Sequence, residues 1–210
     1  MKRVMDIVGS VLGALLLAPV AAPIAIAIRC RLGTPVLFRQ ERAGRHGTPF
    51  TILKFRTMGP LTHVGHPDSE RLSSLGRFLR NSSLDEIPQL WNVLRGQMSL
   101  VGPRPTLPEQ VVGYSQRQRG RLSVRPGLSG WAQVHGRNGL SWPERIELDL
   151  WYVDHRSLLL DLRIIGLTLL RLLRPSGITG AGGQNPGFPH PPGPAPLRAP
   201  PLPSPRKEYR

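Results

Sequence analysis

The chain has 210 residues, which suits one domain of ordinary size with or without a tail. It contains 28 Lys and Arg against 13 Asp and Glu, and the formal net charge of +15 favours an anionic partner: nucleic acid, an acidic membrane surface or a phosphorylated substrate. The single cysteine, Cys30, excludes a disulfide framework within the chain and is natural in a reducing compartment.

An almost wholly apolar segment covers residues 4–28. As a straight helix it would be about 37 Å long, enough to cross a hydrocarbon core of about 30 Å. Three features favour a re-entrant helix-break-helix hairpin instead: a kink or break expected near Ala18-Pro19, with Pro23 close behind; basic residues at both ends, which favour both ends on the cytoplasmic side; and Asp6, which is costly in a bilayer unless it is paired or interfacial. The basic residues are Lys2, Arg3, Arg29 and Arg31. A spanning helix and a cleaved signal peptide are the alternatives.

Short strands and helices are expected next. Residues 36–38 and 50–53 are strand-like, with a turn at 43–47. Helices are predicted at residues 71–80, 84–94, 107–121 and 141–154. Residues 158–173 are apolar but carry three charges, which favours an amphipathic helix in the membrane interface over a buried core helix, the alternative. The Pro- and Gly-rich segment 176–210 cannot bury a core and is predicted to be disordered.

Two adjacent acids, Asp85 and Glu86, are the most informative candidates for chemistry. Ser83-x-x-Glu86 matches a capping box, so a purely structural interpretation is available. The functional interpretation uses the same geometry, because a helix N-terminus attracts phosphate and favours an ionised carboxylate. Neighbouring helical residues point about 100° apart, so one acid could attack phosphorus while the other holds a divalent metal.

Basic residues grouped around Gly and Pro turns could bind a diphosphate. Arg104 lies between two prolines, which stiffen the backbone around its guanidinium. Each basic residue taken singly could equally be a solvated surface charge, but the grouping favours a binding role. The candidates are Lys54, Arg56, Arg80, Arg104, Arg125 and Arg137.

Several common motifs are missing from the sequence. There is no G-x-x-x-x-G-K-[ST] loop, no G-x-G-x-x-G fingerprint and no zinc-ligand spacing. No zinc-finger or RRM signature is present, so a basic nucleic-acid or lipid-binding module without catalysis is the weaker hypothesis.

The motifs taken together resemble the small monotopic bacterial phosphoglycosyl transferases, the initiating "bacterial sugar transferases" with a polyprenyl-phosphate acceptor. The resemblance covers Lys2 to about Pro175. Ala18 departs from the Ser usual in the family, Pro23 is unusual, and His135 replaces a common Asn, which bears on sugar or nucleotide preference. The motifs, in the family's order, are Lys2-Arg3-x-x-Asp6, Pro19, Phe38-x-Gln40-x-Arg42-x-Gly44, Lys54-Phe55-Arg56-Thr57-Met58, Ser83-Leu84-Asp85-Glu86-Ile87-Pro88-Gln89-Leu90, Asn92-Val93-Leu94-x-Gly96-x-Met98-Ser99-Leu100-Val101-Gly102-Pro103-Arg104-Pro105 and Pro126-Gly127-Leu128-Ser129-Gly130-Trp131-Ala132-Gln133-Val134-x-Gly136-Arg137-Asn138.

The resemblance implies a helix-rich α/β monotopic membrane protein at the cytoplasmic face of the bacterial inner membrane. It implies a re-entrant hairpin (1–32), a catalytic domain with interfacial helices (33–175) and a tail (176–210). Asp85 would be the nucleophile that attacks a UDP-sugar and releases UMP, Glu86 the Mg²⁺ ligand, and Arg104 a phosphate contact. Polyprenyl phosphate would then accept the phosphosugar and start surface glycan assembly. Membrane lipids and downstream glycosyltransferases are the other expected partners, and nucleic acid is not; a catalytically silent scaffold is the competing hypothesis.

Overall fold

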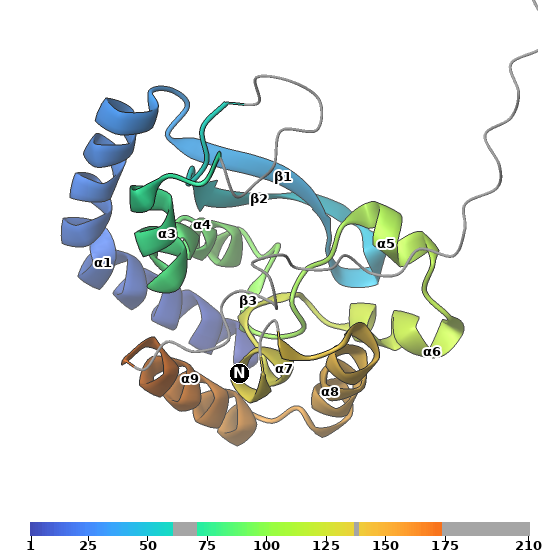
Figure 1. Ribbon diagram of the computed structural model, residues 1–210. Coiled ribbons are helices and arrows are strands. Elements are labelled where there is room, and N and C mark those ends of the chain that lie inside the picture. Colours follow the sequence, from blue (N-terminus) through green and yellow to red (C-terminus); the bar gives the residue numbers. More distant parts are fainter. Residues whose placement is uncertain (61–70, 137–138, 174–210) are drawn as a thin grey trace, which may run out of the picture.

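The computed structural model describes residues 1–60, 71–136 and 139–173. In the described residues a long N-terminal helix, α1 (Lys2–Leu32), packs against a domain of short helices and two small sheets (Figure 1). The strands β1 (Leu37–Ala43) and β2 (Pro49–Phe55) pair antiparallel, whereas β3 (Ser99–Val101) and β4 (Gly127–Ser129) pair parallel. The other elements are η1 (Arg45–Gly47), α3 (Ser74–Asn81), η2 (Leu84–Glu86), α4 (Gln89–Leu94), α5 (Pro108–Val112), α6 (Gln116–Arg119), η3 (Gly120–Ser123), α7 (Trp131–His135), α8 (Trp142–His155) and α9 (Leu158–Leu173). The helix-rich α/β class is therefore confirmed.

The helix α1 runs without interruption through both Pro19 and Pro23, so of the kink or break predicted near Ala18-Pro19 the structure has no break. The ribbon instead changes direction in the middle of α1 (Figure 1), as expected where prolines remove backbone donors from a helix. The helix is long and apolar enough to cross a membrane by length and composition.

The N-terminal half of α1 has two faces. Asp6 and Ser10 are buried against the domain. Gly9 and Gly13 lie on the same side, where added Cβ atoms would approach Leu100 and Leu90, so small residues allow close packing. The opposite face exposes large apolar side chains, namely Val4, Val8, Val11, Leu12, Leu15 and Leu16.

Charged residues at the start of α1 fasten it to the domain. The Arg3 guanidinium donates to the carbonyl oxygens of Val93 and Leu94 at 2.6 and 2.7 Å. The Asp6 carboxylate is only 1% exposed. It accepts hydrogen bonds from Ser99 Oγ and Leu100 N at 2.8 and 2.9 Å. The free-energy cost of placing an acid in an apolar helix is thus offset by these hydrogen bonds inside the domain.

The domain core links the strands to the helix that follows Asp85 and Glu86. Phe50 and Ile52 of β2 pack with Val93 of α4 and with Met98. Asn92, also on α4, donates from Nδ2 to Thr51 O at 2.7 Å and accepts from Leu53 N at 3.1 Å. Because α4 is pinned to β2 in this way, the turn just before it is held over the same strand.

Two predicted helices are divided in the structure. Residues 84–94 form η2 and then α4, and Pro88 caps the second element. Residues 107–121 form α5, α6 and the start of η3, separated by a C-terminal Gly113 and by the Ser115 cap. Local turn chemistry therefore overrides the helical pattern in both segments. The helices expected at 141–154 and 158–173 are present as α8 and α9.

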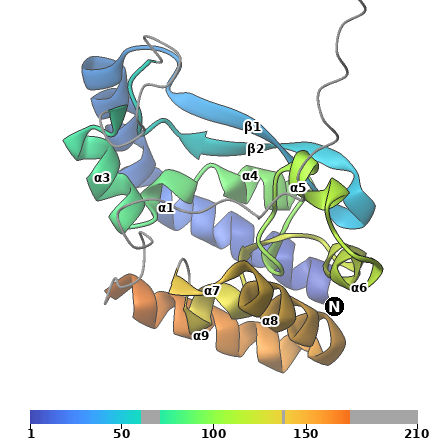
Figure 2. The same cartoon turned by 45° about the vertical axis from the view of Figure 1, so that its right-hand side comes forward.

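The helix α9 lies beside α7 and α8, with the start of α1 close by (Figures 1 and 2). Its inner face buries Asp161 and Ile164. Its outer face exposes Leu159, Leu162, Leu169 and Leu170. The helix therefore has one buried face and one exposed apolar face, and its place in a membrane interface stays a prediction. The tail predicted at 176–210 lies outside the described residues.

Candidate active site

The turn η2 carries the two candidate acids, and its geometry excludes the predicted capping box. Ser83 adopts a left-handed backbone conformation with φ 58° and ψ 14°, and its side chain makes no capping hydrogen bond. Strained backbone of this kind in a residue other than glycine is often found at functional sites. The Glu86 side chain does not reach back to Ser83, because it is engaged by two cations instead.

Four charged side chains from three separate segments meet here, and we call them the Asp85–Glu86 cluster. Lys54 Nζ, on β2, lies 2.6 Å from Glu86 Oε1 and 3.9 Å from Asp85 Oδ2. Arg104 Nη2 lies 2.9 Å from the same Glu86 Oε1. Asp85 is 7% exposed, so the pair is largely shielded from water. The structure therefore brings Asp85, Glu86, Lys54 and Arg104 together, as the sequence analysis expected.

The two adjacent carboxyl groups differ in acidity. Burial raises the pKa of Asp85 to about 6; Lys54 opposes this shift and the Glu86 charge adds to it. Burial also acts to raise the pKa of Glu86, but contacts with Lys54 and Arg104 outweigh it and hold that pKa far below its usual range. Glu86 is therefore ionised at all pH values near neutrality, whereas Asp85 changes its protonation state within about one pH unit of neutrality. Environments that separate two acids in this way are typical of active sites.

The loop that carries Arg104 is fixed by backbone contacts on both sides. Gly102 N donates to Ser129 O, and Gly127 N donates to Pro103 O, each at 2.9 Å. A Cβ at Gly127 would lie 2.1 Å from Gly102 N, so only glycine permits this approach of the two chains. The stiffness expected from the two prolines is therefore reinforced by the β3–β4 pairing.

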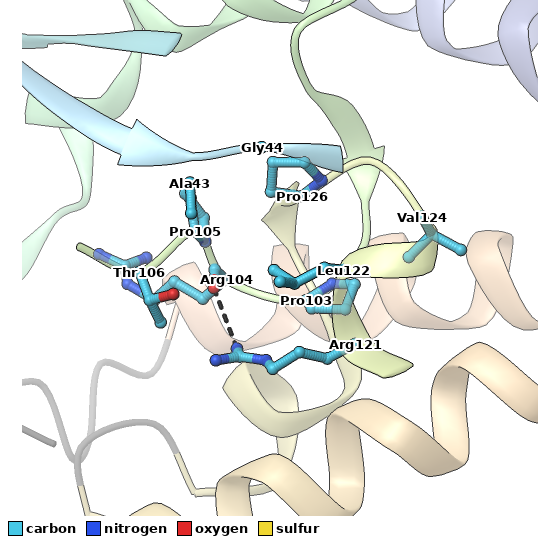
Figure 3. A pocket seen from close by; sticks show the side chains of 10 residues that line it. All are labelled: Ala43, Gly44, Pro103, Arg104, Pro105, Thr106, Arg121, Leu122, Val124 and Pro126. Carbon is cyan, nitrogen blue, oxygen red and sulfur yellow. Dashed lines mark hydrogen bonds between the residues drawn. The ribbon is translucent and has the colours of Figure 1, made fainter. Parts of the chain in front are cut away.

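Arg121 supports the same loop from the other side, although no sequence motif indicated this role. Its Nη2 donates to the Arg104 carbonyl oxygen at 3.0 Å (Figure 3). Arg121 also donates to Asp149 Oδ2 and, at 2.6 Å, to the Tyr114 hydroxyl. Figure 3 shows the Pro103–Thr106 segment between Arg121 and the end of β1. These partners are 7 and 28 residues away in sequence, so no local pattern indicates the network.

Arg42 is a second residue near the cluster that was not a site candidate. Burial lowers its pKa to about 10, and the nearby Arg104 charge adds to the effect, while Glu109 and Glu86 oppose it. Arg42 Nη2 donates to Gln40 Oε1 at 2.5 Å. The Gln40-x-Arg42 spacing puts both side chains on one face of a strand, and this spacing could have indicated that Arg42 lies near the site.

Other predicted site residues lie elsewhere. Arg56 donates to the carbonyl oxygens of Leu32 and Thr34, at the end of α1, and not to the cluster. Arg80 donates through Nε to Thr57 Oγ1 at 3.0 Å and is close enough to Asp85 to lower its pKa. Arg125 donates to Gly96 O at 2.8 Å. Arg137 lies outside the described residues.

The side chains of the cluster can be compared with those that usually bind a divalent metal. In the described part of the chain, no group of three or more His, Cys, Asp or Glu side chains is arranged to hold a metal ion. Asp85 and Glu86 provide two adjacent carboxylates, and Mg²⁺ is commonly held by one or two carboxylates together with substrate phosphates. An ionised Glu86 therefore fits the Mg²⁺ ligand expected from the sequence, provided that the substrate supplies oxygen ligands.

Comparison of the sequence with known proteins identifies a family. The family model described as bacterial sugar transferase matches residues 1–175. A UDP-glucose:undecaprenyl-phosphate glucose-1-phosphate transferase of Caulobacter vibrioides is 44% identical over 185 residues, covering 82% of this chain and 69% of the relative. An uncharacterized sugar transferase of Bacillus subtilis, EpsL, is 44% identical over 181 residues, covering 85% of this chain and 90% of the relative.

A more distant relative shows that the shared region also occurs in longer proteins. The Escherichia coli UDP-glucose:undecaprenyl-phosphate glucose-1-phosphate transferase is 39% identical over 184 residues, which cover 81% of this chain but 40% of that protein. The residues matched by the family model include the Asp85–Glu86 cluster and the apolar N-terminal helix. On the strength of the family match over residues 1–175, the chain belongs to the bacterial sugar transferase family.

Proposed function

We propose that this protein transfers a phosphosugar from a UDP-sugar to polyprenyl phosphate and releases UMP. The observation that carries the proposal is the Asp85–Glu86 cluster, in which a buried acid with a raised pKa adjoins an ionised acid held by two cations. Relatives named as UDP-glucose:undecaprenyl-phosphate glucose-1-phosphate transferases support the substrate classes. The reaction would initiate surface glycan assembly, so downstream glycosyltransferases would consume its product.

Asp85 is the nucleophile in this proposal. Its carboxylate attacks the β-phosphorus of the UDP-sugar, the bond from that phosphorus to the oxygen shared with UMP breaks, and UMP leaves with the electron pair. The phosphosugar is now an acyl phosphate on Asp85. An oxygen of polyprenyl phosphate then attacks the same phosphorus, which breaks the bond to Asp85 and restores the carboxylate. Burial favours the first step because a poorly solvated carboxylate is a stronger nucleophile.

The cations of the cluster position and neutralise the diphosphate. Lys54 and Arg104 both contact Glu86 in the free protein, so the incoming phosphate oxygens can share these donors without new side-chain ordering. Arg80 adds positive charge near Asp85. Glu86 would hold Mg²⁺, which when bound supplies positive charge to the diphosphate.

We also propose how the protein lies in the membrane. The bend in α1, its exposed apolar face and the basic residues at both ends favour a re-entrant hairpin entered from the cytoplasmic side. The outer face of α9 would lie in the same interface. This arrangement keeps the cluster at headgroup level, where a membrane-embedded acceptor can reach it.

The test is UMP release by the purified full chain with Mg²⁺, a panel of UDP-sugars and undecaprenyl phosphate. Asp85→Asn is expected to reduce turnover by about 10⁴-fold or more, because an amide cannot act as the nucleophile. Asp154→Asn, at an exposed position of α8, is the matched control and should keep wild-type turnover. Absence of UMP with every donor would support the silent scaffold, and near-normal turnover of Asp85→Asn would exclude the covalent mechanism.

A further inference from the structure

A second cationic site lies where the starts of α1 and α9 meet the end of α8. It is an open cavity of about 350 Å³. None of the four residues of the Asp85–Glu86 cluster lines it, and we call it the N-terminal cavity. Its basic lining residues are Lys2, Arg3, Arg45, Arg125 and Arg156.

The charges around the N-terminal cavity do not cancel. Two acids, Asp6 and Asp161, line it beside the five cations, so the lining carries 5 − 2 = +3. Asp161 is already paired with Lys2, at 2.6 Å, and accepts from the Tyr152 hydroxyl at 2.7 Å. Asp6 is satisfied by Ser99 and Leu100. The positive charge that is left favours an anion.

The rim of the cavity holds the cations that are best placed to bind a ligand. Arg3 and Arg125 are committed to backbone carbonyl oxygens and have structural roles. Arg45 is exposed and uses only Nε, which donates to Ser123 O at 3.0 Å. Arg156 is exposed at the end of α8. A guanidinium has five N–H donors, so both arginines can offer bidentate contacts to a phosphate.

The two helices that begin at the cavity, α1 and α9, expose apolar side chains on their outer faces. On α1, Val4 is 64% exposed and Val8 is 51% exposed. On α9, Leu159 is 78% exposed and Leu162 is 57% exposed. A cationic cavity at the start of two helices with exposed apolar outer faces matches an amphiphile, with a charged head in the cavity and hydrocarbon beside the helices.

We propose that the N-terminal cavity binds the phosphate headgroup of an anionic phospholipid that does not react. The bound lipid fixes the start of α1 and the start of α9 to the membrane surface. The site goes beyond the phosphosugar transfer proposed above and does not depend on it, because it uses no residue of the Asp85–Glu86 cluster.

The test compares three probes on the full chain in a neutral detergent: dioctanoyl phosphatidylglycerol, dioctanoyl phosphatidylcholine and inorganic phosphate. Ligands that bind only the folded state raise Tm in proportion to the logarithm of their concentration. Arg45→Gln with Arg156→Gln is the test variant. The matched control is Arg39→Gln with Arg119→Gln, which also removes two exposed arginines, one of them bonded to a carbonyl oxygen.

Phosphatidylglycerol is expected to raise the Tm of the wild type and of the control, with apparent affinity about 10- to 30-fold weaker in the test variant, since each cation near an anionic lipid contributes about fivefold. UMP release in detergent should be unchanged in both variants. Equal shifts in all three proteins would overturn the site. Equal shifts with phosphatidylcholine, or with inorganic phosphate, would overturn the anionic lipid as its ligand. The single variant Arg156→Gln repeats the comparison if the double variant folds poorly.

Discussion

Two clusters of buried opposite charges lie about the same loop, and they differ in how completely they are neutralised. Arg121 and Asp149 are each 1% exposed at the side chain and pair with one another under the Arg104 backbone. In the Asp85–Glu86 cluster, two acids share Lys54 and Arg104, and the Arg104 side chain is 43% exposed. The first cluster is closed to solvent, and the second is open at one end.

The contrast is between a closed ion pair and an open cluster built from the same residue types, the second of which is the proposed reaction site. Arg121 and Asp149 pair and hold a loop in place, and Arg121 opposes the rise that burial causes in the pKa of Asp149. Burial also raises the pKa of Asp85, but there the charge of the neighbouring Glu86 adds to the rise. The raised pKa of Asp85 lowers the stability of the fold near neutral pH, as expected for a carboxylate placed for reaction rather than for stability.

The largest expected effect on stability comes from breaking the closed pair. Arg121→Gln leaves the Asp149 carboxylate buried without its cation, which should lower the free energy of unfolding by about 3–5 kcal/mol. Thermal or urea unfolding in detergent measures this loss. Arg119→Gln, at an exposed position on α6, should change it by less than about 0.5 kcal/mol. Equal stability of the two variants would show that the pair does not support the fold.

A smaller effect of opposite sign is expected at Asp85. Its pKa is raised from 3.8 to about 6, so the folded state holds the proton more tightly than the unfolded chain. Stability therefore falls as pH rises between these values and stays lower above pH 6. Asp85→Asn removes this penalty and should raise the free energy of unfolding at pH 7 by about 1–3 kcal/mol, while turnover is lost. A destabilised Asp85→Asn would mean that the carboxylate serves the fold.

The smallest effect is a pH dependence of the first half-reaction. The rate of UMP release in a single turnover without acceptor should fall about tenfold per pH unit below about 6, because only ionised Asp85 attacks phosphorus. Leaving out polyprenyl phosphate removes the titration of its own phosphate from the profile. A rate that stays constant between pH 5 and pH 7 would contradict a nucleophile with this pKa.

The sequence named four residues that the structure brings together, but it did not predict the backbone that holds them. Asp85, Glu86, Lys54 and Arg104 could be named because their motifs are short and occur in a family's order. Arg56 follows Lys54 in the same motif, yet β2 ends at Phe55, and beyond the strand the alternation of side chains no longer applies. Its guanidinium therefore lies at the end of α1.

What the sequence missed depends on contacts between distant segments. Arg121 reaches Asp149 and the Arg104 carbonyl, and the left-handed Ser83 turns its neighbours toward β2. Neither follows from local propensity, because the surrounding packing fixes both. The prolines of α1 predicted a kink or a break, and the sequence could not decide between them; the helix is bent but continuous through both prolines.

The most direct measurement of the central claim is mass spectrometry of the protein mixed with Mg²⁺ and a UDP-sugar in the absence of acceptor. The account predicts a phosphosugar adduct on a peptide that contains Asp85, lost when polyprenyl phosphate is added and not formed by Asp85→Asn. Release of UMP only when both substrates are present, with no adduct at any time, would contradict a covalent aspartyl intermediate.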